Sequence, residues 1–219
     1  MEALKKGNFH LAVDAVVFTI LSKELKILLI KRKIPPFQGS FALPGGFVHL
    51  DEGLEDAARR ELEEETGVKG IFLKKLHAFG DVGRDPRGRV ISIPYLAIIS
   101  SEDLRLQASA DAEAAGWHSV YSLPGLAFDH KKIIDDALKH LRFEIQNTNI
   151  ALQIMPERFT LTELQHAYEI VLNDRLDKRN FRKAMHELGI LKELPEFRMD
   201  GTHRPARLYS FKSRHYRML

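Results

Sequence analysis

The stretch "GFVHLDEGLEDAARRELEEETGV" (residues 46–68) carries a glycine turn followed by a dense run of charged residues. An α-helix fits residues 54–66, because Gly67 can adopt the left-handed conformation that commonly ends helices. The charges of this run either form a solvated helix surface or, by their spacing, assemble a metal site. Each helical residue turns by about 100°, so the two interpretations differ in which charges share the apolar side of the helix.

The charged residues fall on two sides of this helix. Opposite the apolar side lie three residues that fit a solvated surface: Asp56, Arg59 and Glu63. On or beside the apolar side lie three carboxylates: Glu61, Glu64 and Glu65. Like charges at this spacing repel one another, and partial burial raises the cost of keeping them ionised. A divalent cation removes that cost, and ligands that are all oxygen suit Mg²⁺ or Mn²⁺.

A proline and two glycines, Pro44, Gly45 and Gly46, precede the helix and permit a tight turn. We expect this turn to bring backbone groups and the carboxylate of Glu52 close to the acidic side of the helix. Arg60 is spaced to pair with an acidic group of the turn and to hold it in position. A glycine-rich turn before an acidic helix can hold a diphosphate through metal bridges, so Gly45 and Gly46 are candidate ligand contacts.

The rest of the first two thirds of the chain predicts a layered domain. Apolar, β-branched runs predict strands at 11–20, 25–32, 70–80 and 89–99, and helical spacing predicts a helix at 129–145. Strands followed by helices with mixed alternation indicate an α/β or α+β domain. With 219 residues, the chain is long enough for a medium-sized domain and a smaller second one.

A polar break, "QNTN" (146–149), predicts a division into domains at 1–147 and 148–219. Thr160 and Glu163 form the capping pattern that starts a helix. The second domain is expected to contain a helix at 161–172 and a second helix at 178–188, which Asp177 begins and Gly189 ends. A hairpin is expected around the turn Asp200-Gly201.

The predicted helix 178–188 separates its residues into an apolar and a basic side. Its apolar side is expected to face a core through Phe181, Ala184, Met185 and Leu188. Residues 148–219 hold 13 Lys and Arg against 9 Asp and Glu, whereas residues 1–147 hold 20 against 21. These features favour a winged helix-turn-helix whose second helix enters the major groove of DNA. Two alternatives remain: the basic side of the helix is only solvated, or the domain serves in dimerisation or in docking a protein. The candidate DNA contacts are Lys178, Arg179, Asn180, Arg182, Lys183, Arg204 and Arg207.

The composition of the chain limits both its expected cellular compartment and the kinds of metal ligand it can offer. The chain has no cysteine, which excludes disulfides and thiolate metal sites and agrees with a reducing compartment. No window approaches the roughly 18 apolar residues of a membrane-spanning helix, and the first residues lack the apolar core of a secretory leader. We therefore expect a cytoplasmic protein with no membrane partner, whose metal ligands are oxygen or imidazole.

Residues 46–68 resemble the Nudix box, G-x5-E-x7-R-E-U-x-E-E-x-G-U with U aliphatic, at every defined position. The resemblance implies a Nudix α/β/α sandwich with a mixed sheet, and hydrolysis, dependent on Mg²⁺ or Mn²⁺, of a nucleoside diphosphate linked to another moiety. It also implies that Glu61, Glu64 and Glu65 are the metal ligands, with the identity of the catalytic base left open among them. Glu52 would support these ligands and Arg60 would orient them, which completes the candidate catalytic group.

Candidate substrate contacts outside the box are fewer. In "GDVGRDPRGR" (80–89), Arg84, Arg87 and Arg89 are candidates to meet phosphate or ribose, although such a loop can also be only solvated. Phe37 is a candidate to stack on a base, with core packing as its alternative role.

Most of residues 10–212 also resemble the Nudix-related transcriptional regulators. The resemblance is carried by "GSFALPGGFV", by "GRDPRGRVISIPYLA", and by "FTLTELQHAYEIVLNDRLDKRNFRKAMHELGIL" followed by "RPARLYSF". It implies that the Nudix domain senses ADP-ribose or a related nucleotide, and that a homodimer binds a palindromic double-stranded operator and releases it when ligand binds.

The complete box leaves two functions open. Some members of that regulator family have lost box residues and only bind their ligand, whereas this chain keeps every one. The box therefore supports either surviving hydrolysis or metal-assisted ligand binding alone. The competing hypothesis is an ADP-ribose pyrophosphatase whose second domain only dimerises or docks a protein partner.

Overall fold

The computed structural model describes residues 8–100, 115–199, 205–213 and 215–219. Two compact units can be distinguished in the chain. The first comprises Met1–Phe18, Lys26–Ala97 and Leu104–Leu138, and the second comprises Thr19–Leu25, Ile98–Asp103 and Lys139–Leu219. None of the described helices is long and apolar enough to cross a membrane.

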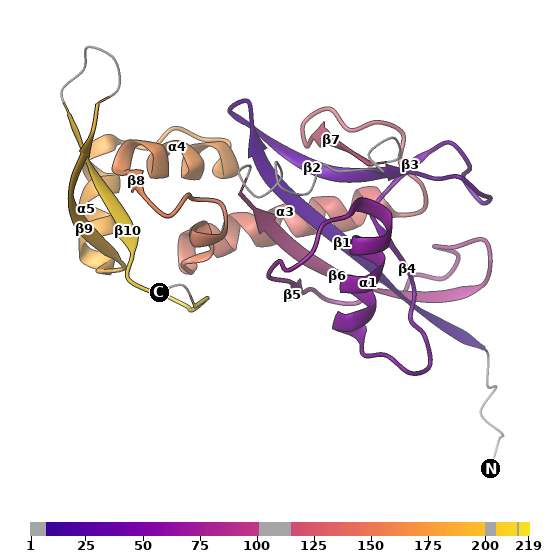
Figure 1. Ribbon diagram of the computed structural model, residues 1–219. Helices are drawn as coiled ribbons and strands as arrows, with labels where there is room; N and C mark the ends of the chain where they lie inside the picture. Colours follow the sequence, from indigo (N-terminus) through magenta and orange to yellow (C-terminus); the bar gives the residue numbers. More distant parts are fainter. Residues whose placement is uncertain (1–7, 101–114, 200–204, 214) are drawn as a thin grey trace. The chain divides into compact units, whose positions relative to one another are not determined.

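A seven-stranded sheet, most of whose residues belong to the first unit, is the main sheet of the chain (Figure 1). Its main path runs β3-β2-β1-β6-β5, while β4 pairs with β1 and β7 pairs with β2. The strands are β1 (Phe9–Leu21), β2 (Glu24–Lys31), β3 (Phe41–Ala42), β4 (Gly45–Phe47), β5 (Lys74–Lys75), β6 (Arg89–Ile99) and β7 (Ala115–Ser119). The central strand β1 is buried from residue 13 to residue 19, as expected for a strand covered on both faces.

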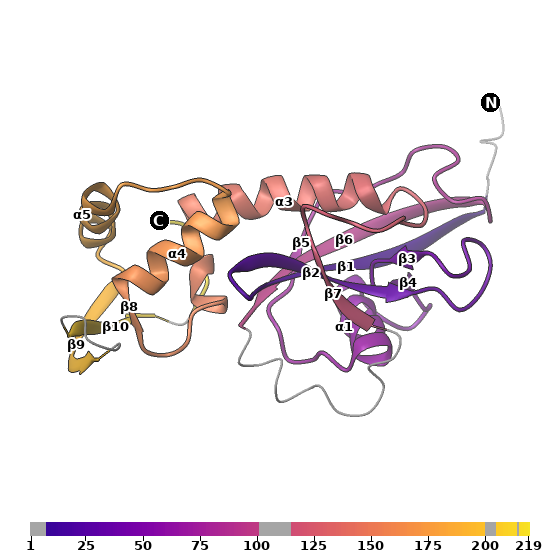
Figure 2. The same ribbon diagram turned by 90° about the horizontal axis from the view of Figure 1, so that it is seen from above.

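Two helices cover this sheet. Figure 2 shows α3 (His130–Asn147) on one side of the central strands and α1 (Leu54–Thr66) on the other. Helix α1 has the predicted bounds, because Gly67 takes φ 72° and its N–H returns to the carbonyl of Glu63. The predicted α/β class, with a mixed sheet between helices, is confirmed.

One predicted strand is much shorter in the structure. Of residues 70–80, only β5 forms a ladder with β6, and Phe79 makes a further isolated bridge to Ser92. Between these contacts β6 contains Pro94, which has no N–H to donate to a neighbouring strand. The ladder is therefore interrupted where the sequence pattern alone predicted a continuous strand.

After α3, the described residues of the second unit form two further α-helices and a three-stranded antiparallel sheet of order β8-β10-β9. Its elements are η1 (Ile150–Gln153), β8 (Phe159–Thr160), α4 (Leu161–Leu172), α5 (Lys178–Leu188), β9 (Leu191–Arg198) and β10 (Ala206–Phe211). Thr160 and Glu163 form the predicted capping box, and Asp177 accepts the N–H groups of Arg179 and Asn180. Both helices thus begin at their predicted caps, and α5 ends at the predicted Gly189, whereas α4 is ended by Asn173, for which no cap was predicted. The predicted turn Asp200-Gly201 lies outside the described residues.

The predicted apolar side of α5 is only half buried. Phe181 and Met185 pack into the core of the second unit, where the ring of Phe181 lies 5.2 Å from that of Tyr168. Ala184 and Leu188 are instead exposed, which corrects the expectation that all four apolar residues face a core. These two line an open apolar groove along α5, together with residues of α4.

Candidate functional site

Arg60 joins the carboxylates of the acidic helix. Its guanidinium makes two hydrogen bonds to Glu52, of 2.6 Å from Nη2 and 2.9 Å from Nε. It also donates through Nη1 to Glu61 at 2.8 Å and to Glu64 at 3.3 Å. The hydrogen bonds from Arg60 and from the His49 N–H lower the pKa of Glu52 to about 2. Glu52 and Arg60 therefore form a charged bracket beside the other glutamates, as the sequence predicted.

Glu65 lies deeper than the other glutamates and accepts the backbone N–H of Gly45 at 2.9 Å. Burial raises the pKa of Glu65 to about 7, and the nearby Glu61 adds to that increase. Glu64 is the exposed member of the group, with 59% of its side chain accessible. A divalent cation would restore the ionised form of Glu65 and relieve its repulsion with Glu61, so the three carboxylates fit a metal held by oxygen.

The glycine turn lies against both β1 and α1. In β4, Gly45 pairs with Asp14 and Gly46 pairs with Val13 of β1. A Cβ on Gly45 would overlap the backbone oxygen of Val13, so only glycine allows the turn to approach β1 this closely. A Cβ on Gly46 would displace the carboxylate of Glu61, a predicted metal ligand. Gly45 and Gly46 therefore lie beside the acidic side of the helix, as the sequence predicted.

A polar cleft opens beside this turn. It is lined by Gly45 and Gly46 and by residues from β1, from just after β2, from the loop 81–88 and from residues 128–130 where α3 begins. The charged or aromatic members of this lining are Asp14, Arg32, Phe47, Arg84, Asp85, Arg87, Phe128 and His130. The cleft therefore adjoins the predicted metal ligands, which gives a ligand held there access to both sets of residues.

Asp14 is a buried carboxylate at the base of the cleft, with 7% of the residue exposed. It accepts a short hydrogen bond from the hydroxyl of Ser92 on β6. His130 accepts the Leu43 N–H through Nδ1 at 2.9 Å, so its second nitrogen, Nε2, carries the proton of the neutral ring. That Nε2 lies 3.5 Å from Asp14 Oδ1. These contacts fix the orientation of the His130 ring.

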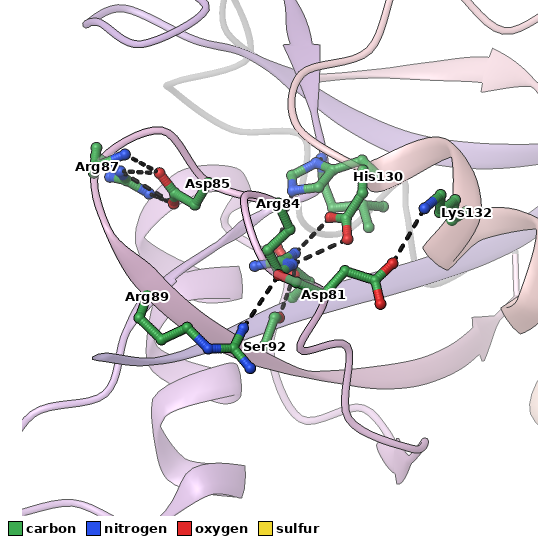
Figure 3. Close-up of polar contacts among 11 residues, drawn as sticks. Asp81, Arg84, Asp85, Arg87, Arg89, Ser92, His130 and Lys132 are labelled. Carbon is green, nitrogen blue, oxygen red and sulfur yellow. Dashed lines mark hydrogen bonds and ion pairs between the residues drawn. The ribbon is translucent and has the colours of Figure 1, made fainter. Parts of the chain in front are cut away.

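Arg84 is buried beside Asp14, which contradicts the alternative that this arginine is solvated. Only 4% of its side chain is exposed. It makes two hydrogen bonds to Asp129, of 2.7 and 3.0 Å, and lies 3.9 Å from Asp14 (Figure 3). Two carboxylates thus surround one guanidinium, so Arg84 serves first to hold the base of the cleft together.

At the mouth of the cleft, two arginine guanidinium groups lie against the rings of two phenylalanines. Arg87 is held by Asp85 at 2.7 Å and lies 4.7 Å from the ring of Phe47 and 5.3 Å from that of Phe128. On Phe128 also lies the guanidinium of Arg32, 4.8 Å from the ring centre. Such cation–π contacts keep each group in place before a ligand arrives.

Arg32 differs from the other two arginines of the cleft. It donates to the carbonyl oxygens of Pro36 at 2.8 Å and Ile34 at 3.4 Å. Within the part of the chain that the structure describes, it has no carboxylate at ion-pair distance, whereas Arg84 has two and Arg87 has one. Burial and the neighbouring Arg87 lower the pKa of Arg32. An anion bound in the cleft would offset that unfavourable charge.

The remaining predicted ligand residues lie away from the cleft lining. Arg89 donates to the backbone oxygens of Gly80 and Asp81 on the other side of the loop (Figure 3). Phe37 makes an edge contact with Phe128, with ring centres 4.9 Å apart, and remains 43% exposed.

Sequence reasoning missed several residues of the cleft: Asp14, Arg32, Phe47, Asp85, Phe128 and His130. One of them left a signal, because Asp14 is an acid inside the apolar run "LAVDAVV". The others left none, because the cleft is assembled from segments that are distant from one another in the sequence.

The basic side of α5 is exposed over its whole length. The predicted DNA contacts on this helix, Lys178, Arg179, Asn180, Arg182 and Lys183, are all accessible to solvent. Arg207 on β10 pairs with Glu193 at 3.2 Å and lies 5.0 Å from the exposed ring of Phe197 on β9. Arg204, a further predicted contact, lies outside the described residues. The described arrangement is that of a helix-turn-helix followed by a β-hairpin wing.

Two family models match the chain in the same order as these sites. The NUDIX domain matches residues 9–137, and the NrtR DNA-binding winged helix domain matches residues 151–211. Together with the complete box on α1 and the basic helix α5, these matches define a Nudix-domain protein that carries a C-terminal winged helix.

Relatives identify the family more narrowly. The chain is 37% identical over 210 residues to the ADPR responsive transcriptional repressor NtrR of Acinetobacter baylyi, covering 94% of this chain and 83% of the relative. It therefore belongs to the NrtR family of Nudix-domain transcriptional repressors. Over 137 residues it is also 47% identical to the ADP-ribose pyrophosphatase of Methanocaldococcus jannaschii, covering 62% of this chain and 79% of that enzyme.

Solved structures resemble the whole chain and the first domain alone. NrtR of Shewanella oneidensis in complex with a 27mer DNA superposes with a TM-score of 0.82 at 33% identity, covering 92% of this chain and 93% of that one. The NUDIX domain of the same protein in complex with ADP ribose gives a TM-score of 0.55 at 35% identity, covering 62% and 90%.

Proposed function

We propose that this protein is a transcriptional repressor that binds ADP-ribose in its Nudix domain and double-stranded operator DNA with its winged helix. The observation that supports this most strongly is the presence, in one chain, of a complete acidic site beside a polar cleft and of an exposed basic helix α5. Similarity to an ADPR responsive repressor over 94% of the chain agrees with both halves of the proposal.

In the Nudix domain, Glu61, Glu64 and Glu65 would hold Mg²⁺ or Mn²⁺, and Glu52 and Arg60 would keep them in place. Such a cation would supply Lewis-acid stabilisation of the negative charge on a bound diphosphate. The raised pKa of buried Glu65 and its contact with the Gly45 N–H support this assignment, because a neighbouring cation offsets the cost of ionising that carboxylate.

The cleft beside the metal ligands would receive the nucleotide. Gly45 and Gly46 allow backbone to approach the diphosphate, and Arg87 is held ready by Asp85 and two aromatic rings. Arg32 is the guanidinium that gains most from an anion, because carbonyl oxygens are its described hydrogen-bond partners. Arg84 would act by holding Asp14 and Asp129, whereas Phe37 and Arg89 would reach the ligand only after their side chains move.

The winged helix would bind DNA through Lys178, Arg179, Asn180, Arg182, Lys183, Arg204 and Arg207. We place the domain boundary between residues 147 and 148, and we expect a homodimer, because two copies of α5 match the two halves of a palindromic operator. DNA-binding regulation also implies that the protein acts in the cytoplasm.

A titration of operator DNA tests the proposal. Labelled DNA from upstream of the protein's own gene should bind in a salt-sensitive, sequence-specific manner, and saturating ADP-ribose with Mg²⁺ should weaken that binding. Fluorescence anisotropy measures both effects. If the same DNA and a scrambled sequence bind equally at every salt concentration, the repressor function is lost.

We also propose that hydrolysis of ADP-ribose survives, because every box residue is present. Release of phosphate from ADP-ribose, measured with Mg²⁺ and a coupled phosphatase, should fall about 100-fold or more in Glu64→Gln and Glu65→Gln. Glu63→Gln is the matched control, because Glu63 is exposed on the same helix and pairs with Lys69. Equal background release from all four proteins would leave the domain as a sensor only.

The alternative function is an ADP-ribose pyrophosphatase whose second domain dimerises or docks a protein. The 47% identity of the Nudix region to an ADP-ribose pyrophosphatase favours it. The two proposals differ in one measurement, because hydrolysis without any specific operator binding would support the enzyme and exclude the repressor.

A further inference from the structure

The segment that connects the two family-matched regions is buried. Residues 147–149, here called the joint, lie between the match to the Nudix domain and the match to the winged helix. Thr148 and Asn149 are 0% and 2% exposed. Sequence composition predicted a polar break at this place, yet solvent does not reach these two residues. Other groups must therefore satisfy their hydrogen bonds.

Those groups belong to residues 215–219, here called the strap. Backbone pairing joins the two segments, from Asn149 N–H to Arg217 at 3.2 Å and from Leu219 N–H to Asn147 at 2.9 Å. Thr148 and Met218 form an antiparallel bridge between these bonds. The strap therefore adds a short second strand to the joint.

The side chain of Asn149 doubles this pairing. Its Nδ2 donates to the carbonyl oxygen of His215 at 2.8 Å, and its Oδ1 accepts the N–H of Arg217 at 2.7 Å. An amide that both donates to and accepts from one strand fixes the register of that strand. Asn149 thus recognises the strap through backbone groups on both sides of residue 216.

Tyr216 extends the contact from the joint to α3. Its hydroxyl donates to Glu144 Oε2 at 2.6 Å, and Glu144 is only 3% exposed. The backbone oxygen of Glu144 also accepts the N–H and the hydroxyl of Thr148, each at 2.8 Å. A buried carboxylate is stable only with such donors, so the strap and the end of α3 depend on each other.

The strap lies beyond the wing along the chain. Strand β10 ends at Phe211, and the Lys212 N–H returns to the carbonyl of Ile190, just after α5. The chain therefore enters the winged helix through the joint and comes back to the same joint after the wing. Because the strap pairs with the joint, the two segments move together. A joint without the strap would transmit less of a movement from one domain to the other.

We propose that the strap holds the joint rigid and thereby transmits ligand binding in the Nudix domain to operator binding by the winged helix. This inference rests on the proposed repressor function. Coupling between two sites requires that each ligand favour one state of an element that both sites influence. The joint and strap together provide that element within the chain.

Three variants weaken the strap to different extents. Tyr216→Phe removes only the hydroxyl that meets Glu144, Asn149→Ala removes the paired amide, and a chain shortened after Ser213 lacks the whole strap. Tyr121→Phe is the matched control, because Tyr121 is a 48% exposed tyrosine of the first unit. Each variant is compared with the full chain below its melting temperature, after circular dichroism has confirmed folding.

Two measurements decide the proposal. The first is the ratio of operator Kd values with and without saturating ADP-ribose and Mg²⁺, expected to be about tenfold or more in the full chain. It should fall toward one in the strap variants, with the operator Kd in the absence of ADP-ribose and the Kd for ADP-ribose each changed less than about twofold. The second is amide hydrogen exchange at residues 147–150, which should become about tenfold faster without any ligand or DNA present.

An unchanged Kd ratio in variants whose joint exchanges faster would overturn the transmission role. Unchanged exchange in the variants would show that the joint holds without the strap, which also overturns it. If the shortened chain does not fold, Tyr216→Phe and Asn149→Ala still provide both readouts. A full chain whose operator affinity ignores ADP-ribose would refute the repressor function itself, and exchange would then decide separately whether the strap holds the joint.

Discussion

His130 links the base of the cleft to the glycine turn. Its Nδ1 holds the Leu43 N–H, one residue before Pro44, and its Nε2 faces Asp14. The carbonyl of Pro44 accepts the Ala15 N–H at 2.7 Å. The turn is therefore connected to β1 both through His130 and Asp14 and through this backbone hydrogen bond. These contacts hold the backbone of the turn, which donates to Glu65 at Gly45. A single uncharged histidine thus contributes to the position of a candidate metal ligand.

The neutrality of His130 predicts a pH dependence of stability. Burial lowers the pKa of His130 and Arg84 and Arg32 lower it further, against the opposing charges of Asp14 and Asp129. Below about pH 6.5 the unfolded chain takes up a proton at this position before the folded chain does. Stability should therefore fall as the pH drops from about 6.5, by at most about 1.4 kcal/mol per pH unit from this group.

Urea denaturation of the metal-free protein at pH 7.5 and pH 5.5 measures this effect. The free energy of unfolding should decrease more in the native protein than in His130→Gln, whose side chain does not titrate. Parallel decreases in the two proteins would mean that His130 is not the titrating group.

At the scale of elements, the helices carry their own start and stop signals. Thr160 with Glu163 begins α4, Asp177 begins α5, and Gly67 and Gly189 end α1 and α5 with positive φ. These signals act within one turn, which explains why sequence patterns predicted the bounds of all three helices. Strand β5 could not be predicted in this way, because its length depends on Pro94 in a partner strand.

Helix α5 predicts a specific loss of DNA binding. Arg179→Glu combined with Arg182→Glu replaces two exposed cations by anions, so operator affinity should fall about 100-fold or more near 0.1 M salt. ADP-ribose affinity should not change. The double variant Lys33→Glu with Lys75→Glu alters net charge equally on exposed residues of the first unit. Equal losses in the two double variants, measured by anisotropy, would reduce the effect to net charge alone.

The chain combines a polar cleft beside an acidic helix in its first unit with the basic helix α5 in its second unit. Similarity to known NrtR structures extends over 92% of the chain, so the order of the two domains is that of the family. A ligand that binds only the folded Nudix domain must stabilise that domain by mass action. If the ligand binds through a metal, this stabilisation depends on the whole site, because the three glutamates, the turn and the cleft must then bind the metal and the ligand together.

Thermal unfolding tests this dependence. ADP-ribose at 100 times its Kd with Mg²⁺ should add about 2.7 kcal/mol and raise the Tm of the Nudix transition by roughly 5–10 °C. Calorimetry or a dye-based melt measures the shift, and an excess of EDTA should remove it. The same shift in the presence of EDTA would show that the nucleotide binds without a metal, contrary to the assignment of Glu61, Glu64 and Glu65.

The amino-acid sequence by itself determined the helix bounds, the grouping of Glu61 with Glu65, and the basic side of α5. Each of these depends on spacing within a single helix, where 3.6 residues per turn translate order into position. Only the tertiary structure decided that Arg84 is buried between Asp14 and Asp129, that Arg32 is the open guanidinium of the cleft, and that residues 215–219 close over Asn149. The contacts of Arg84 with Asp129 and Asp14, of Arg217 with Asn149 and of Arg32 with Phe128 join residues 45 to 96 positions apart. Local periodicity carries no information about which distant segments the core brings together.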